Sequence, residues 1–130
     1  MELFDYFENK TGTGILATAD QNGQVNAAIY SRPHIFEDGT AGFIMRDRLT
    51  HANLQTNGSA AYLFREDGGG YNGRRLYLSK ISEEKDTERL SALKRRHLPP
   101  ESEAAKGPPY LVIFKVTKVL PLIGDGGQED

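Results

Sequence analysis

Apolar and polar positions alternate in short runs along most of the chain, and turn-forming residues separate the runs. The stretch "GILATADQNGQVNAAIYS" (14–31) predicts two strands joined at 20–23, where Asn-Gly supplies the positive φ values of a tight hairpin. "HIFEDGTAGFIMR" (34–46) repeats the pattern, with its turn at 37–39 and an apolar strand from Ala41 to about Arg46. Residues 14–46 are therefore expected to form a three-stranded meander.

Three further strands are predicted downstream. "SAAYLFR" (59–65) and "RRLYLSKI" (74–81) flank the glycine-rich stretch "EDGGGYNG" (66–73), which is typical of a hairpin tip rather than a strand interior. "YLVIFKVTKVLPL" (110–122) is the most strongly β-prone run of the chain. The strands therefore dominate the expected secondary structure.

Short helices are predicted in three places. Apolar residues at positions 3, 4 and 7 indicate an amphipathic helix at the start of the chain, and a polar helix spans about 49–57 with Gly58 as its stop. A third helix is expected after Ser82 as N-cap, with Glu83 and Glu84 in its first turn, where the helix dipole favours negative charge. It would run to about His97, before Pro99 and Pro100 close it.

The helices fall between hairpins instead of alternating with every strand. This order favours a closed antiparallel barrel with peripheral helices over a parallel doubly wound sheet. The interior of a six-stranded barrel fills with side chains, so a ligand is expected outside it, in a cleft or between subunits. At 130 residues, the chain is expected to be one domain (1–130) with a frayed tail from about 124.

Composition removes several classes of function. The chain has no cysteine, and its three histidines have no metal-ligand spacing, so no metal site is expected. With a net charge of −2, the chain has no excess of positive charge that would bind nucleic acid. No apolar run approaches the ~20 residues that span a membrane, and the acidic start "MELFDYFENK" does not read as a signal peptide. We therefore expect a cytoplasmic protein.

The start of the 49–57 helix concentrates phosphate-binding groups. Arg46 at a strand end and Arg48 in the turn precede it, and Thr50 and His51 lie in its first turn. The first N–H groups of a helix lack internal partners and carry partial positive charge, so a phosphate there gains hydrogen bonds and a favourable field. The alternative interpretation is an ordinary surface helix, with Thr50 as its cap and both arginines in solvent.

The strand at 25–30 carries Asn26, Ala27 and Ala28, whose small side chains would let a flat ligand approach the backbone. Close packing of a barrel strand against a helix explains the same residues. Arg32 either neutralises a second anionic group or faces water. Tyr71, in the glycine-rich loop, is a candidate for stacking on a ring, whereas the carboxylates at 83–88 read as a solvated helix face. No catalytic residue is identifiable.

In this order, the pieces resemble the FMN-binding split-barrel proteins related to pyridoxamine 5'-phosphate oxidase. The resemblance covers about residues 12–81 and rests on "GILATADQNGQVNAAIY", "FEDGTAGFIM" and "LTHANLQTNGSAAYLF". Thr50, Asn53, Leu54, Asn57 and Gly58 occupy the positions of the helix and turn that characterise these proteins. The chain is close in length to the small FMN-binding proteins of this superfamily.

The resemblance implies a six-stranded antiparallel split barrel that works as a homodimer, with FMN at the subunit interface. Residues 26–29 would line the isoalloxazine ring, 46–50 would hold the phosphate and ribityl chain, and the residue at 53 would brace the phosphate turn. Part of the partner subunit, such as 71–75, would cover the ring. The implied cofactor-binding residues are Asn26, Ala27, Ala28, Ile29, Arg46, Asp47, Arg48, Leu49, Thr50 and Asn53.

Two departures from the family pattern matter for function. Relatives often carry a lysine where Leu49 or Thr50 stands here, so Arg48 or Arg46 would have to supply that charge. The substrate-binding Arg/His pair of the vitamin B6 oxidases is missing near the C-terminus. The resemblance thus implies an FMN-dependent oxidoreductase of unknown substrate, reduced by a nicotinamide or by a protein electron donor. The alternatives are an FMN electron carrier or sensor, a haem- or deazaflavin-binding protein, and a ligand-free dimeric barrel.

Overall fold

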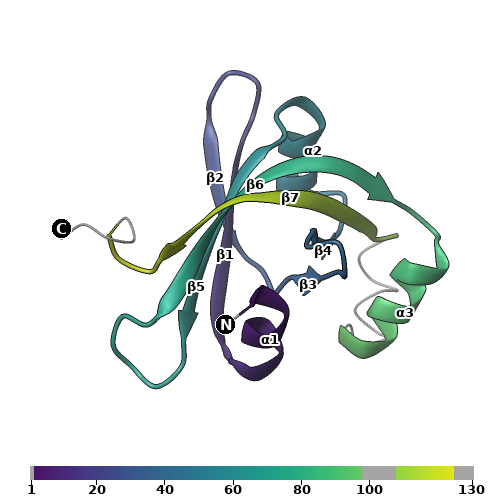
Figure 1. Ribbon diagram of the computed structural model, residues 1–130. Coiled ribbons are helices and arrows are strands. Elements are labelled where there is room, and N and C mark those ends of the chain that lie inside the picture. Colours follow the sequence, from purple (N-terminus) through teal and green to yellow (C-terminus); the bar gives the residue numbers. More distant parts are fainter. Residues whose placement is uncertain (1, 98–107, 125–130) are drawn as a thin grey trace.

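In a computed structural model that describes residues 2–97 and 108–124, an antiparallel sheet curls around one core (Figure 1). The described strands are seven, in the order β2-β1-β5-β6-β7-β4-β3, one more than the six predicted because the two-residue β3 counts as a strand. The elements are α1 (Leu3–Asn9), β1 (Gly12–Ala19), β2 (Val25–Ile29), β3 (His34–Ile35), β4 (Ala41–Met45), α2 (Leu49–Thr56), β5 (Ser59–Glu66), β6 (Gly73–Glu84), α3 (Glu88–His97) and β7 (Tyr110–Pro121).

The core consists of the inward side chains of the strands. Leu16, Tyr62, Phe64, Leu76 and Phe114 are completely buried, as the alternation of apolar and polar positions in β1, β5 and β6 requires. Aromatic rings in this cluster meet mostly edge to face, which is the geometry that their quadrupoles favour. The interior is thus filled by side chains, as expected for a small barrel.

Both predicted hairpin turns are confirmed. In the β1–β2 turn, the carboxylate of Asp20 accepts hydrogen bonds from the backbone N–H groups of Asn22 and Gln24. Gly23 has a φ of 84° and Gly39, in the β3–β4 turn, has a φ of 86°, values that glycine adopts without steric cost. The two tight turns therefore follow directly from local sequence.

The predicted meander over 14–46 is wrong. The β1–β2 hairpin lies at one edge of the sheet and the β3–β4 hairpin at the other, because β4 pairs with β7 and not with β2. Nearly every residue of β4 is buried, so both faces of this strand need a cover. Phe43 packs into the main core, while Ile44 packs against Leu90 of α3 and Leu111 of β7 in a second apolar cluster. At this end of the sheet, the main core covers one face of β4 and the cluster with Leu90 of α3 covers the other.

The third helix begins later than predicted. Ser82, Glu83 and Glu84 belong to β6, where Glu83 pairs with Val112 of β7. The hydroxyl of Thr87 accepts the N–H of Leu90 at the true start of α3. The prolines expected to close this helix, and the tail beyond 124, lie outside the described residues.

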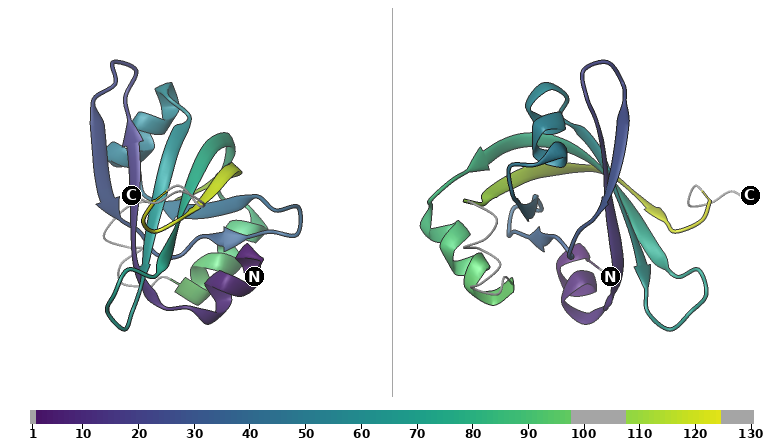
Figure 2. Two further views of the ribbon diagram at one scale, coloured as in Figure 1. Left: turned by 60° about the vertical axis from the view of Figure 1, so that its left-hand side comes forward. Right: turned by 180° about the vertical axis from the view of Figure 1, so that it is seen from behind.

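The first helix forms as predicted, but it presents a different face to the core. Tyr6 and Phe7 are buried, whereas 54% of Phe4 is exposed. Figures 1 and 2 place α1 and the β5–β6 hairpin tip at one end of the barrel and α2 at the other, beside the β1–β2 hairpin. None of the helices within the described parts of the chain has the length and apolar character needed to cross a membrane.

Candidate functional site

The start of α2 has an arginine where a capping side chain normally stands. The helix begins at Leu49, as predicted, with Arg48 at the N-cap, and no side chain of the described residues accepts a hydrogen bond from its first turn. A guanidinium has donors but no acceptor, so Arg48 cannot cap the helix. Thr50 is not the cap either, because it lies inside the helix and is buried. The expectation that Thr50 caps this helix is therefore wrong, although Arg48 is exposed, as the same interpretation expected.

Polar contacts join the first turn of α2 to β2. The side-chain amide of Asn26 donates to the hydroxyl of Thr50 at 3.4 Å, which is a long hydrogen bond. The Tyr30 hydroxyl also hydrogen-bonds to Thr50; burial raises the pKa of Tyr30, and this hydrogen bond offsets part of the rise. The structure thus brings together two predicted site residues that are 24 positions apart in the sequence.

A second set of contacts fastens the body of α2 to β1. The buried Asn53 donates from its amide nitrogen to the hydroxyl of Thr18 at 3.1 Å. Asn57, at the end of the helix, donates to the carbonyl oxygen of Asp20 in the β1–β2 turn. These two asparagines therefore set the position of the helix against the β1–β2 hairpin.

The strand expected to line a flat ring is the edge strand of the sheet. Asn26 and Ala28 are half-buried, whereas Ala27 and Ile29 are exposed on the other face, so the four predicted residues do not share one side-chain surface. They do share an open edge, because β1 is the only partner of β2 among the described strands. Half of the main-chain N–H and C=O groups of an edge strand point away from its partner and can bind a ligand.

The arginines near the predicted site differ in their surroundings. Arg46 is half-buried at the end of β4, and Arg48 is exposed. Arg32 has neither of the expected roles: its guanidinium donates to the carbonyl oxygens of Phe7 and Lys10, at 2.8 and 2.6 Å. It thereby satisfies acceptors that the end of α1 leaves unpaired.

A buried histidine lies behind the first turn of α2. The ring of His51 is 5% exposed and stacks on Tyr110 of β7, with 4.1 Å between the ring centroids. Its Nδ1 is 3.1 Å from a carboxylate oxygen of Asp47, and its Nε2 is 3.2 Å from one of Glu83. The two carboxylates lie at opposite nitrogens and do not converge on one point, and among the described residues no cluster of three or more potential ligands could hold a metal ion.

Glu83 is part of this cluster and not of a solvated helix face, as the sequence had suggested. Burial of the Glu83 carboxylate acts to raise its pKa, but hydrogen bonds from Lys80, Gln55 and His51 outweigh burial and lower the pKa to about 2. The side-chain nitrogen of Lys80 is 2.8 Å from this carboxylate. Only the pairing of β6 with β7 brings Glu83 beneath α2, so no local pattern could have revealed it.

The glycine-rich loop is confirmed as the tip of the β5–β6 hairpin, with Tyr71 exposed. Arg74 lies over the ring of Tyr6, and Arg75 donates to the carbonyl oxygens of Pro121 and Gly124. The tip and α2 lie at opposite ends of the barrel (Figure 2). Tyr71 therefore cannot contact a ligand bound at α2 of its own protomer.

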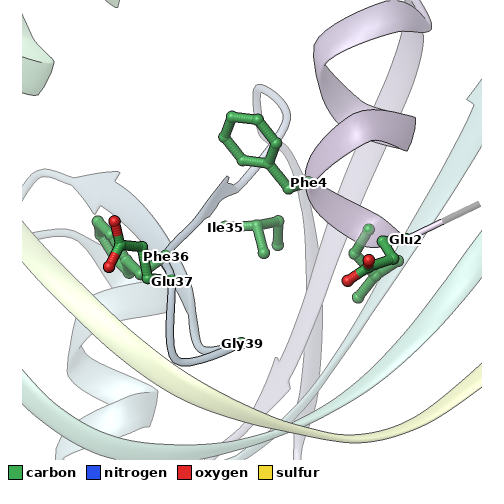
Figure 3. A pocket seen from close by; sticks show the side chains of 7 residues that line it. Glu2, Phe4, Ile35, Phe36, Glu37 and Gly39 are labelled. Atoms are coloured by element: carbon green, nitrogen blue, oxygen red, sulfur yellow. The ribbon is translucent and has the colours of Figure 1, made fainter.

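A cleft of about 610 Å³ opens between α1 and the β3–β4 hairpin (Figure 3). Its walls are mainly apolar, and carboxylates of Glu2 and Glu37 stand at opposite sides. None of the predicted cofactor-binding residues lines it, and its acidic side chains disfavour a phosphate. The lining residues are Glu2, Leu3, Phe4, Ile35, Phe36, Glu37 and Gly39.

Comparison with known proteins identifies the fold. No protein-family pattern matches the sequence, and no curated protein is detectably similar. Among solved structures, an FMN-binding protein from Syntrophomonas wolfei superimposes with a TM-score of 0.75 at 23% identity, over 95% of this chain and 85% of that one. An F420 reductase has a TM-score of 0.69 at 15% identity, over 89% and 94% of the two chains.

A heme-binding protein from Mycobacterium smegmatis has a TM-score of 0.60 at 20% identity, over 99% of this chain and 55% of that one. At these levels of identity the likeness shows the fold alone. The chain has the FMN-binding split-barrel fold of proteins related to pyridoxamine 5'-phosphate oxidase, as the sequence resemblance implied.

Replacing Glu83 tests the buried cluster through the pH dependence of stability. Because its pKa in the folded protein, about 2, lies below the ordinary value, ionised Glu83 stabilises the fold above that ordinary value. We expect Glu83→Gln to lower the free energy of unfolding by about 1–3 kcal/mol at neutral pH. This difference should shrink as the pH falls from about 4.3 toward 2. Urea unfolding across this range measures it.

The exposed Glu37 provides the matched control, because Glu37→Gln removes the same charge from the β3–β4 turn, outside the cluster around His51. We expect Glu37→Gln to lower the free energy of unfolding by less than ~0.5 kcal/mol. Equal losses in the two variants, or a loss at Glu83 that does not vary with pH, would contradict the role assigned to the Glu83 carboxylate.

Proposed function

We propose that this chain, which has the split-barrel fold, is a flavoprotein that binds FMN between the start of α2 and the open edge of β2. The observation that carries the proposal is the first turn of α2, where Arg48 occupies the cap position and no described side chain accepts a hydrogen bond. Backbone N–H groups without acceptors, together with a neighbouring guanidinium, form a binding site for a phosphate.

In this proposal, the FMN phosphate accepts hydrogen bonds from the first-turn backbone N–H groups of α2 and from the guanidinium of Arg48. Arg46, at the end of β4, adds positive charge, while Asp47 and Leu49 contribute backbone to the turn. The hydroxyl of Thr50 is turned toward Asn26 and Tyr30, so this residue shapes the site from behind. Asn53 braces the turn through its bond to Thr18.

The ring of the cofactor lies along β2 in this proposal. The polar edge of an isoalloxazine presents hydrogen-bond donors and acceptors, and the open side of an edge strand offers matching main-chain groups from Asn26 to Ile29. The small side chains of Ala27 and Ala28 leave room for close approach. The contact between Asn26 and Thr50 keeps this edge next to the phosphate site.

A second copy of the chain completes the site. Apart from Arg75, the outward side chains of neighbouring strands are apolar or small, and the ladder aligns them in two rows that begin on β2. Val25 and Ile29 are 78% and 73% exposed there, a large apolar surface for a protein to leave in water. The rows are Ala27, Ala17, Ala61, Tyr77 and Ile29, Ile15, Leu63, Arg75. This face is the dimer interface in our proposal, and the partner covers the ring.

Bound FMN supplies the hydride and electron chemistry, and the protein supplies orientation, charge and exclusion of water. The reaction class is therefore oxidoreduction, with a nicotinamide or a protein as electron donor. A haem protein of this fold is a weaker candidate, because both ring nitrogens of the buried His51 already face carboxylates. Reduction of the flavin by a nicotinamide would favour an enzyme over an electron carrier.

The visible absorption spectrum tests the cofactor. We expect the purified protein to be yellow, or to take up one FMN per protomer on titration, with quenching of the flavin fluorescence as the measurement. Anaerobic addition of NADH or NADPH should then bleach the flavin if the protein is an enzyme. A Soret band, or the absence of saturable FMN binding, would overturn the assignment.

Arg48→Ala tests the phosphate site. The side chain is exposed, so the free energy of unfolding should change by less than ~0.5 kcal/mol. The dissociation constant for FMN should rise about tenfold, since a charge-assisted hydrogen bond contributes about 1.5 kcal/mol. Combining it with Thr50→Ala should weaken binding further, because Thr50 joins the first turn of α2 to Asn26 of β2. Arg65→Ala, at another exposed arginine, is the control and should leave FMN affinity unchanged.

Ile29→Asp tests the dimer. The residue is exposed in the single chain, so the fold should tolerate a carboxylate, whereas an apolar interface between two copies should not. Light scattering after size-exclusion chromatography should report a dimer for the native protein and a monomer for the variant. Phe4→Asp, at an exposed apolar residue on α1, should remain a dimer. A native monomer at micromolar concentration would refute the interface.

A further inference from the structure

We propose that the cleft between α1 and the β3–β4 hairpin binds a small organic cation with an apolar body, such as a primary amine on a short aromatic or aliphatic chain. The inference does not rest on the proposed function, because none of the residues proposed to bind FMN lines the cleft. Figures 1 and 2 place α1 and α2 at opposite ends of the barrel. The cleft is therefore a second site, which can be tested separately from the first.

The size and walls of the cleft fit a small molecule. Its volume of about 610 Å³ lies within the ~300–1,000 Å³ of typical ligand pockets. The apolar walls come from Leu3 and Phe4 on one side and from Ile35 and Phe36 on the other. At Gly39 the cleft is open to solvent, because an added Cβ would meet no other atom within 4 Å. An apolar body thus has surfaces to contact and a way in.

Phe4 is the apolar group that a ligand would remove from water. The same helix buries Tyr6 and Phe7 in the core, whereas 54% of Phe4 is exposed. Figure 3 shows the ring of Phe4 extending from α1 into the space between this helix and the β3–β4 hairpin, where Ile35 also lies. Burial of an exposed aromatic ring against an apolar ligand is favourable, so this side chain is suited to a binding role.

Both walls of the cleft carry negative charge. The carboxylates of Glu2 and Glu37 stand at opposite sides of it (Figure 3), and neither forms an ion pair with any cationic side chain of the described residues. Asp5 on α1 and Asp38 in the turn add to this charge, and neither α1 nor the stretch 34–45 contains a lysine or an arginine. The cleft therefore attracts a cation and repels an anion.

One wall already shows how an aromatic ring of the cleft interacts with a cation. The guanidinium of Arg89, on α3, lies over the ring of Phe36, 4.5 Å from its centroid. Arg89 is paired with Glu84 and not with either carboxylate of the cleft. Among the described residues no cation lies over the ring of Phe4. The face of this ring is available to the cationic group of a ligand.

Three probes that share one apolar body test the class of ligand. At about pH 7, 4-phenylbutylamine is a cation, 4-phenylbutanol is neutral and 4-phenylbutyrate is an anion. In an amide NMR titration of the protein without FMN, we expect the amine to shift the signals of Leu3, Ile35 and Gly39, with a dissociation constant of about 1 mM. The alcohol should bind about two- to fivefold more weakly, and the carboxylate should give no saturable shift. The signals of α2 and β2 should not move.

Glu2→Gln and Glu37→Gln test the two carboxylates. Each variant should raise the dissociation constant of the amine about two- to fivefold and leave that of the alcohol unchanged. Glu8→Gln is the matched control, because Glu8 is an exposed residue of the same helix that does not line the cleft. Phe4→Ala should weaken the binding of both probes, since it removes part of the apolar wall. All four side chains are exposed, so the fold should tolerate these changes.

Several outcomes would overturn the inference. They are the absence of a saturable shift with the amine, equal affinities for amine and alcohol, and a loss of affinity in Glu8→Gln as large as in the two cleft variants. Shifts of the cleft signals that follow protein concentration and not the probe would mean that a second copy fills the cleft, and would also refute the proposal. Saturation with FMN should leave the affinity for the amine unchanged, so the result stands whether or not the protein is a flavoprotein.

Discussion

The proposed site depends on how α2 is held, although no side chain in the described part of the protein caps its start. A helix of eight residues has little stability of its own, so its position must come from tertiary contacts. Asn53 binds Thr18 of β1, Asn26 of β2 binds Thr50, and His51 reaches across to β6. Because these buried contacts use side chains, the backbone donors of the first turn remain available for a ligand. The same arrangement thus holds α2 in place and leaves its first-turn backbone N–H groups open to a ligand.

The two edges of the sheet are treated in opposite ways. Next to the two-residue edge strand β3, the β4 strand is buried on both faces, by the core and by the cluster around Leu90 and Ile113 that α3 contributes to. The β2 strand, at the other edge, leaves Val25 and Ile29 exposed and one side of its main chain unpaired. An open edge next to an apolar face is a liability in a monomer. In our proposal, a cofactor covers this edge and a second copy of the chain covers the apolar face.

Local pattern predicted the turns, most strands and the start of α2, because those features depend on residues that are close in the sequence. The meander was a wrong prediction, since the partner of β4 is chosen by burial on both of its faces. The role of Glu83 was also missed, because β6 continues through it instead of ending at a helix cap. Its partners come from 28 and 32 positions away in the sequence.

By itself, the amino-acid sequence indicated the split-barrel fold, the two tight hairpins and the start of α2 at Leu49, but it left open whether Thr50 caps that helix. Periodicity and turn chemistry are local, so they can be read along the chain. Only the tertiary structure decided that Arg32 serves α1, that Thr50 faces inward, and that two carboxylates enclose the ring of His51. These contacts depend on which strands pair and on which polar groups become buried and need hydrogen-bond partners. Both are decided by residues that are far apart in the sequence.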